Sequence, residues 1–128
     1  MIKPFHLSIV VPDIAAAKQF YCNFLNCPLG HDAGSWVNIL FYGHQLTIHQ
    51  ESQPMKSIPI DHFGPIMDKA DWLTVADTIK KNDIPFVMPP SIKNQNQPDE
   101  SGKFLIRDPA GHLLEFKFYS DFNQTVTQ

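Results

Sequence analysis

The sequence has little positive charge, little cysteine and no long apolar run. Arg107 is its only arginine and the formal net charge is -3, which argues against a basic surface that follows nucleic-acid phosphates. No apolar run approaches the roughly 20 residues that cross a bilayer, and the N-terminal apolar stretch is too short for a secretion signal. Two cysteines, Cys22 and Cys27, do not make a disulfide framework. We therefore expect free thiols in a cytoplasmic protein without nucleic-acid or membrane partners.

The overall composition indicates a folded globular protein. Of the 128 residues, 43% are hydrophobic and 18% charged, which suits one domain with a single core. A strand is predicted at 4–11, and Asp13 can cap the following helix, which Pro28 ends. Three short strands are then predicted, and a polar stretch with two prolines follows as a linker. These segments are 29–32, 36–42 and 44–50 for the strands and about 51–59 for the linker.

The same order of elements then repeats. The predicted segments are a strand at 60–67, a helix at 68–83, strands at 84–88, 103–107 and 112–119, and a flexible tail at 120–128. A polar loop at 89–102 is too long for an ordinary hairpin and is a candidate lid. The sequence thus predicts an α+β fold in which two paired βαβββ units, about 4–50 and 60–119, make one domain over 1–128. Their half-closed mixed sheet would surround a cavity.

Three potential metal ligands fall at matching places in these units. His6 opens the first predicted strand, His62 lies in the corresponding strand 56 positions later, and Glu115 lies in the last strand. Because side chains alternate along a strand, each is expected on the face opposite the fully apolar set. Two imidazoles and a carboxylate make a facial metal triad with positions left for substrate. From the residues alone, a salt bridge from Glu115 to Lys117 or Arg107 is an equally valid interpretation.

Two segments resemble a known family. FHLSIVVPDIAAAKQFY at the start and FLIRDPAGHLLEFKFY at the end look like the vicinal oxygen chelate superfamily, and the DPAGHLLEF segment at 108–116 is the most specific. This superfamily includes glyoxalase I, fosfomycin- and bleomycin-resistance proteins and extradiol dioxygenases, and GHQLTIH and DHFG resemble its small glyoxalase- or dioxygenase-like members. The resemblance implies that His6, His62 and Glu115 bind a divalent metal, with Fe(II) or Mn(II) favoured and Zn or Ni as further candidates.

The chain departs from the glyoxalase pattern at the fourth ligand. Thr47 stands where that ligand is expected, and threonine binds divalent metals poorly. His49 shares its face and has three interpretations: a shifted fourth ligand, an acid-base group, or the cap of an exposed edge strand. We predict His49 and Tyr119 as catalytic. The predicted substrate-binding residues are Thr47, Lys117, Trp36 and Phe104.

These features predict a metal-dependent enzyme that chelates adjacent oxygens of a small substrate, nearest to a dioxygenase-like activity. One alternative is a glyoxalase-like lyase or isomerase. Another is a metal-free protein that binds or sequesters a small molecule and so confers resistance. A homodimer is expected, and His6 and His62 then come either from one chain or from two. The sequence leaves open the substrate and the metal.

Overall fold

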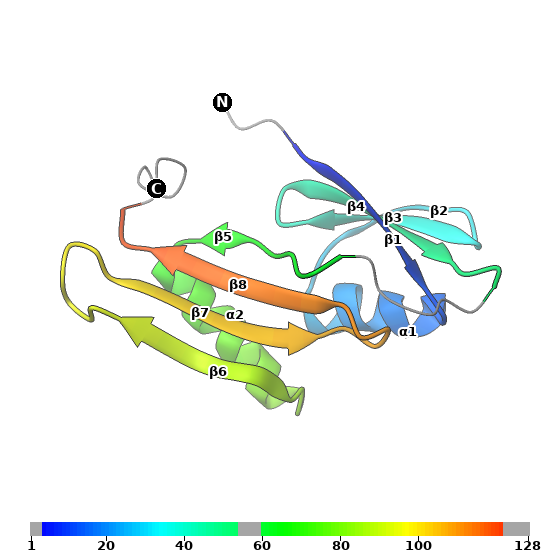
Figure 1. Ribbon diagram of the computed structural model, residues 1–128. Helices are drawn as coiled ribbons and strands as arrows, with labels where there is room; N and C mark the ends of the chain where they lie inside the picture. Colours follow the sequence, from blue (N-terminus) through cyan, green and yellow to red (C-terminus); the bar gives the residue numbers. More distant parts are fainter. Residues whose placement is uncertain (1–3, 54–59, 122–128) are drawn as a thin grey trace. The chain divides into compact units, whose positions relative to one another are not determined.

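The protein consists of two compact units, each built around a four-stranded mixed sheet. The computed structural model describes residues 4–53 and 60–121. Unit 1 comprises residues 1–59 with 108–111, and unit 2 comprises residues 60–107 with 112–128. Neither sheet closes into a barrel, and helices cover one face of each (Figure 1). The predicted α+β class and its two repeated units are therefore confirmed.

Unit 1 follows the predicted order of elements closely. Its elements are β1 (His6–Val11), α1 (Ile14–Lys18), the π-helical turn η1 (Gln19–Phe24), β2 (Leu29–Asp32), β3 (Trp36–Phe41) and β4 (His44–Gln50). The strand order is β1-β4-β3-β2, with β1 parallel to β4. Asp13 caps α1 as predicted, because its Oδ1 accepts the N–H groups of Ala15 and Ala16 at 3.0 and 3.2 Å.

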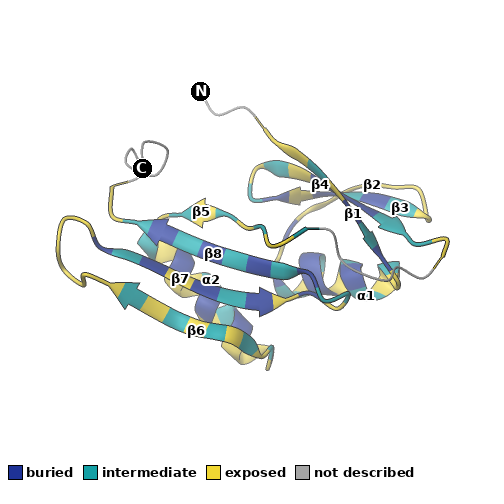
Figure 2. Ribbon diagram, viewed as in Figure 1, coloured by how far each residue is buried: buried dark blue, intermediate teal, exposed yellow. Residues whose placement is uncertain are grey.

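The two faces of the first sheet differ in polarity. Alternate strand residues are buried on the face that packs against the helical segment, as the dark bands in Figure 2 show. They are Ile9, Val11, Val37, Ile39, Phe41, Leu46 and Ile48. The opposite face carries His6, Thr47 and His49, with Trp36 on the neighbouring strand. Period-two alternation thus separates the core from the side chains predicted to form the site.

A buried hydrogen bond ties the helical segment of unit 1 to residues 108–111. Tyr21 has no exposed surface, and its hydroxyl donates to Asp108 Oδ2 at 2.9 Å. The other oxygen of the same carboxylate accepts the Ala110 N–H at 3.0 Å. Burial raises the pKa of Tyr21 well above its ordinary value, and the negative charge of Asp108 raises it further. The DPAG turn therefore contributes a packed structural contact as well as leading into the last strand.

Tyr21→Phe is expected to destabilise the protein by about 1–3 kcal/mol at neutral pH, because Asp108 loses a buried donor. The native state also holds the Tyr21 proton more tightly than the unfolded chain does. Stability from this group is therefore complete below about pH 10 and falls as pH rises further, by about 1.4 kcal/mol per pH unit for one proton. Urea unfolding at pH 8 to 11 should show a shallower alkaline loss in the variant. An unchanged slope would show that this proton is not held by the fold.

Unit 2 repeats the pattern with a longer helix. Its elements are β5 (Ile66–Met67), α2 (Lys69–Lys81), β6 (Phe86–Lys93), β7 (Ser101–Arg107) and β8 (Leu113–Tyr119). The strand order is β5-β8-β7-β6, with β5 parallel to β8. Asp68 caps α2 by accepting the Asp71 N–H at 2.8 Å. No helix among residues 4–53 and 60–121 is long and apolar enough to cross a membrane.

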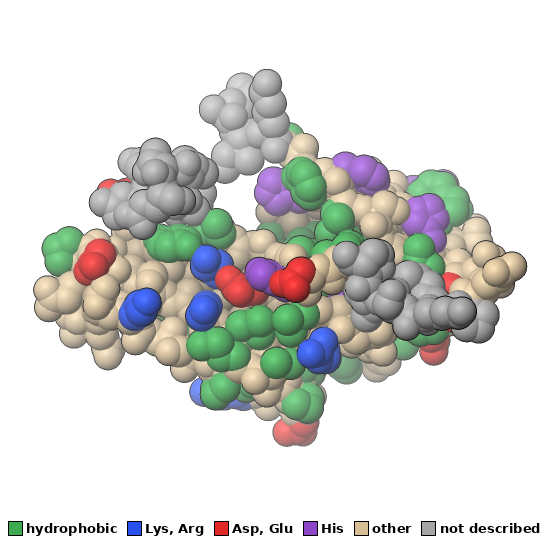
Figure 3. Space-filling model, in the orientation of Figure 1, with side chains coloured by type: hydrophobic (Ala, Val, Ile, Leu, Met, Phe, Trp, Pro, Cys, Tyr) green, Lys and Arg blue, Asp and Glu red, His purple; other side chains and the backbone are tan. Residues whose placement is uncertain are grey.

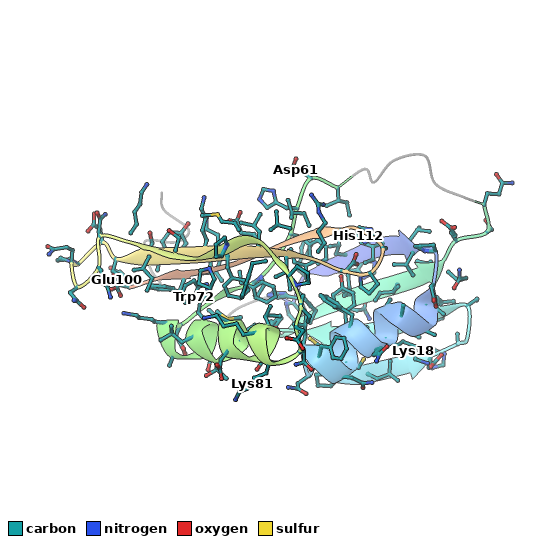
Figure 4. The ribbon with its side chains drawn as sticks, turned by 90° about the horizontal axis from the view of Figure 1, so that it is seen from below. Lys18, Asp61, Trp72, Lys81, Glu100 and His112 are labelled. Carbon is teal, nitrogen blue, oxygen red and sulfur yellow. The ribbon has the colours of Figure 1, made fainter. Side chains whose placement is uncertain are left out.

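Aromatic side chains fill the space between α2 and the second sheet. Trp72 is completely buried and donates its Nε1–H to the Phe116 carbonyl at 3.0 Å, and Figure 4 shows it between helix and sheet. Phe104 stacks on Phe116 with ring centroids 4.8 Å apart and planes 9° apart. Phe104 has no exposed surface. It belongs to the core because it lies on the helix face of β7, which corrects the expectation that it contacts substrate.

Two predicted boundaries were wrong, both in segments that contain proline. The strand expected at 60–67 is reduced to β5, with an isolated bridge between Phe63 and Leu114, because Pro65 lacks the N–H that would continue the ladder. The loop expected at 89–102 is shorter, because β6 continues through Pro89 and Pro90. Prolines are tolerated there since β6 is an edge strand with register shifts. Positions 54–59 of the expected linker and 122–128 of the tail lie outside the described residues.

Candidate functional site: a histidine and carboxylate array

Four ionisable side chains form a continuous array on the open face of unit 2. Asp61 Oδ2 lies 2.5 Å from His62 Nδ1, and His62 Nε2 lies 3.6 Å from Glu115 Oε2. The other oxygen of Glu115 lies 3.6 Å from Lys117 Nζ. Figure 4 shows Asp61 on the side of the sheet opposite α2. The structure thus brings His62 and Glu115 together, two of the three predicted ligands.

The contact from Asp61 fixes which nitrogen of His62 is available. A carboxylate accepts hydrogen bonds only, so Nδ1 carries a proton and Nε2 is the ring nitrogen directed toward Glu115. This carboxylate–histidine arrangement is typical of metal-binding histidines, since it sets the tautomer and increases ligand basicity. Sequence reasoning missed Asp61. The only available signal was its position next to His62 in the DHFG segment.

Gly64 allows the segment that carries His62 to approach β8. A Cβ atom at Gly64 would lie 1.7 Å from the Glu115 carbonyl oxygen, far inside contact distance. The neighbouring hydrogen bonds join Glu115 N to the Phe63 carbonyl at 2.9 Å and Phe63 N to the Leu113 carbonyl at 3.1 Å. The glycine of DHFG is therefore needed for close backbone packing beside the array.

His6 in unit 1 also has its Nδ1 atom within hydrogen-bond distance of a side-chain oxygen. It is exposed on β1, and its Nδ1 lies 2.8 Å from Gln45 Oε1 on the paired strand β4. Because the amide oxygen is an acceptor, Nδ1 again carries a proton, and Nε2 is the ring nitrogen that this contact does not use. Gln45 is a second hydrogen-bond partner of a predicted ligand that sequence reasoning missed. Its signal is the cross-strand register, which pairs it with His6.

The strand registers identify the counterpart of Glu115 in unit 1. Thr47 lies opposite Ser8 on β1, just as Glu115 lies opposite Gly64, between the Phe63–Leu114 and Ile66–Lys117 pairs. Thr47 is buried, and its hydroxyl donates to Asn38 Oδ1 at 2.7 Å. A hydroxyl committed to a neighbour on its own sheet is a poor metal ligand. The structure therefore adds no fourth carboxylate on β4.

The remaining predicted residues lie on the open faces of their own sheets. His49 is half-buried and pairs in register with Trp36, whose ring centroid is 5.1 Å from that of His31. Tyr119 follows Lys117 on β8, with the Lys117 ammonium 5.1 Å from the Tyr119 ring centroid. His112, just before β8, is buried, with only 3% of its surface exposed.

The complete triad remains a prediction. His6 belongs to unit 1, whereas His62 and Glu115 belong to unit 2. Among residues 4–53 and 60–121, no group of three or more His, Cys, Asp or Glu side chains that could hold a metal ion is found. The donor set nevertheless fits a divalent cation chemically, because two imidazoles and the carboxylate of Glu115 are ligand types that divalent metals take in proteins.

The fold and these residues lead to the family. Residues 3–116 match the Glyoxalase/Bleomycin resistance protein/Dioxygenase superfamily, and the chain belongs to it. A glyoxalase/bleomycin resistance protein/dioxygenase from Alicyclobacillus acidocaldarius is 30% identical over 94% of both chains, with a TM-score of 0.80. The resemblance to the vicinal oxygen chelate superfamily is thereby confirmed.

Two further solved structures show the same fold at lower identity. A lactoylglutathione lyase from Agrobacterium tumefaciens is 19% identical over 91% of this chain and 92% of its own, with a TM-score of 0.69. A glyoxalase/dioxygenase from Nostoc punctiforme is 17% identical over 91% of this chain and 90% of its own, with a TM-score of 0.72. No curated protein matches the sequence.

Proposed function

We propose that the protein is a metal-dependent enzyme that binds two adjacent oxygens of a small substrate, nearest to a dioxygenase-like activity. The carrying observation is that both candidate histidines have Nδ1 held by an oxygen acceptor, Gln45 for His6 and Asp61 for His62. A hydrogen bond from Nδ1 to an oxygen acceptor is typical of metal-binding histidines, whereas a histidine in the core or on the surface does not require one. His6, His62 and Glu115 are the proposed ligands, with Fe(II) or Mn(II) favoured by two imidazoles and one carboxylate.

A bound divalent ion would supply Lewis acidity and a template for two neighbouring substrate oxygens. The chain's own residues then position the substrate and move protons. Lys117 can donate to an anionic oxygen, since hydrogen bonding to Tyr119 and the nearby Glu115 charge raise the pKa of its ammonium against the opposing effect of partial burial. Tyr119 can donate a hydroxyl proton from the same strand, and His49 is the proposed acid-base group of unit 1.

One observation favours a second function, a metal-free protein that binds a small molecule. The Lys117 ammonium lies 3.6 Å from an oxygen of Glu115, so a charge of the protein itself partly neutralises this carboxylate. A lyase or isomerase with water in the fourth ligand position is a second enzymatic alternative. It is less favoured, because Thr47 occupies the position where a fourth ligand would stand.

Elemental analysis of protein purified without chelator tests the proposal. We expect about one divalent ion per chain, reduced in His6→Ala and Glu115→Gln. Oxygen uptake with catechols would support the dioxygenase-like activity, and lactoylglutathione formation from methylglyoxal and glutathione would support the lyase. Substoichiometric metal in the wild type, together with unchanged ligand binding by His6→Ala, would overturn the metal proposal in favour of sequestration. Light scattering on the same samples tests the expected homodimer.

A further inference from the structure

A pocket of about 320 Å³ lies on the open face of the second sheet, next to the histidine and carboxylate array. Six of its lining residues form two cross-strand rows, Ser91–Lys103–Lys117 and Lys93–Ser101–Tyr119. Its size falls in the range of about 300–1,000 Å³ that is usual for small-molecule sites. All of these residues belong to unit 2. Figure 3 shows the basic side chains in blue on this face, close to acidic and histidine side chains.

The lining of the pocket carries more positive than negative charge. Lys103 and Lys117 are direct cross-strand partners on β7 and β8, and like charges in that position repel each other. Lys117 has Glu115 as a partner at 3.6 Å. Lys93 and Lys103 have no carboxylate partner among residues 4–53 and 60–121. Three ammonium groups against one carboxylate therefore leave two positive charges uncompensated.

Neutral donors complete the lining of the pocket. The hydroxyls of Ser91, Ser101 and Tyr119 lie beside the lysines in the two rows. Hydroxyls and ammonium groups together donate several charge-assisted hydrogen bonds to a compact group that carries several acceptor oxygens. An apolar or cationic ligand would leave these donors unused.

We propose that this pocket binds a dianionic group of the substrate, with a phosphate monoester as the favoured chemistry and a dicarboxylate as the comparison. This inference rests on the proposed function in one respect, since Lys117 joins the pocket to Glu115. If the pocket holds the dianionic group, the rest of the substrate can extend along β8 toward His62 and Glu115. The rows of lysine and hydroxyl then act in substrate selection, whereas His62 and Glu115 act in metal binding.

Calorimetric titration of the purified protein with phenyl phosphate, terephthalate, benzoate, benzyl alcohol and inorganic phosphate tests the pocket. We expect phenyl phosphate to bind more tightly than benzoate, and benzyl alcohol to bind most weakly. The double variant Lys93→Met/Lys103→Met should weaken phenyl phosphate binding at least about tenfold and flatten its dependence on salt. Lys80→Met, at the end of α2, is the matched control and should bind as the wild type does.

Thermal unfolding of ligand-free protein gives an independent readout. Lys103→Met alone should raise the melting temperature, because it removes repulsion with Lys117, and phenyl phosphate should stabilise the wild type more than this variant. Equal binding of benzyl alcohol and phenyl phosphate, or wild-type affinity in the double variant, would overturn the inference. Tighter binding of terephthalate would assign the dianion to a dicarboxylate and overturn the phosphate assignment.

Metal content of the same samples separates the two proposals. If the double variant retains metal and loses phenyl phosphate binding, both the pocket and the metal site stand as separate sites. If the wild type binds phenyl phosphate but no metal, the anion pocket stands and the proposed metal function fails. If the wild type binds metal but no dianion, only the pocket inference fails.

Discussion

His62→Ala is expected to lower the affinity for a divalent metal at least about 100-fold and to abolish metal-dependent turnover. The substitution removes one of three proposed ligands and leaves Glu115 with Lys117 as its remaining ion-pair partner. Asp61→Ala should have a smaller effect, about 10- to 100-fold, because it removes the acceptor that fixes the tautomer and leaves the ligand itself in place. Competition titration against a chromophoric chelator measures both affinities.

His31→Ala is the matched control for these variants. His31 is exposed and stacks at a tilt beside Trp36, so its removal should leave metal affinity at the wild-type value. The expected order is wild type and His31→Ala, then Asp61→Ala, then His62→Ala. If His62→Ala binds metal as the wild type does, His62 is not a ligand. The array would then be a network of ion pairs on a binding surface.

The fold was predictable because local patterns determine most of it. Asp13 and Asp68 cap the two helices as short acidic residues do, and alternation along β4 and β8 separates polar from apolar faces without tertiary information. The order of elements and the exposed face of Glu115 follow from these patterns alone. The repeat places His6 and His62 at equivalent positions, which is why they stand out in the sequence.

The supporting residues of the site were not predictable in the same way. Gln45 contacts His6 only because β1 and β4 pair in parallel, a register that no local pattern specifies. Lys93 and Lys103 appear in the sequence as ordinary surface lysines until β6, β7 and β8 bring them beside Lys117. Phe104 was misplaced because the face of β7 depends on its pairing with β8. Contacts between distant strands thus decide the roles of these residues.

Gly64→Ala is expected to destabilise the protein by about 3 kcal/mol or more and to weaken metal binding. The added Cβ would meet the Glu115 carbonyl oxygen at 1.7 Å, and a backbone atom in a paired strand cannot move aside as a flexible side chain can. The segment that carries His62 must therefore shift away from β8, breaking the hydrogen bond from Glu115 N to Phe63 O and separating His62 from Glu115. Urea unfolding and metal titration measure the two effects.

Gly34→Ala separates this steric effect from the general cost of losing a glycine. Gly34 has φ of +86° and no atom within 4 Å of an added Cβ, so alanine there costs only backbone strain, about 1 kcal/mol, with no change in metal affinity. At Gly64, by contrast, the loss of stability comes from the collision of the added Cβ with the backbone of β8. A Gly64→Ala protein that matches Gly34→Ala in stability and retains metal would show that the 62–66 segment does not need this approach to β8. Loss of both properties together would show that a single backbone contact couples the fold of unit 2 to its proposed chemistry.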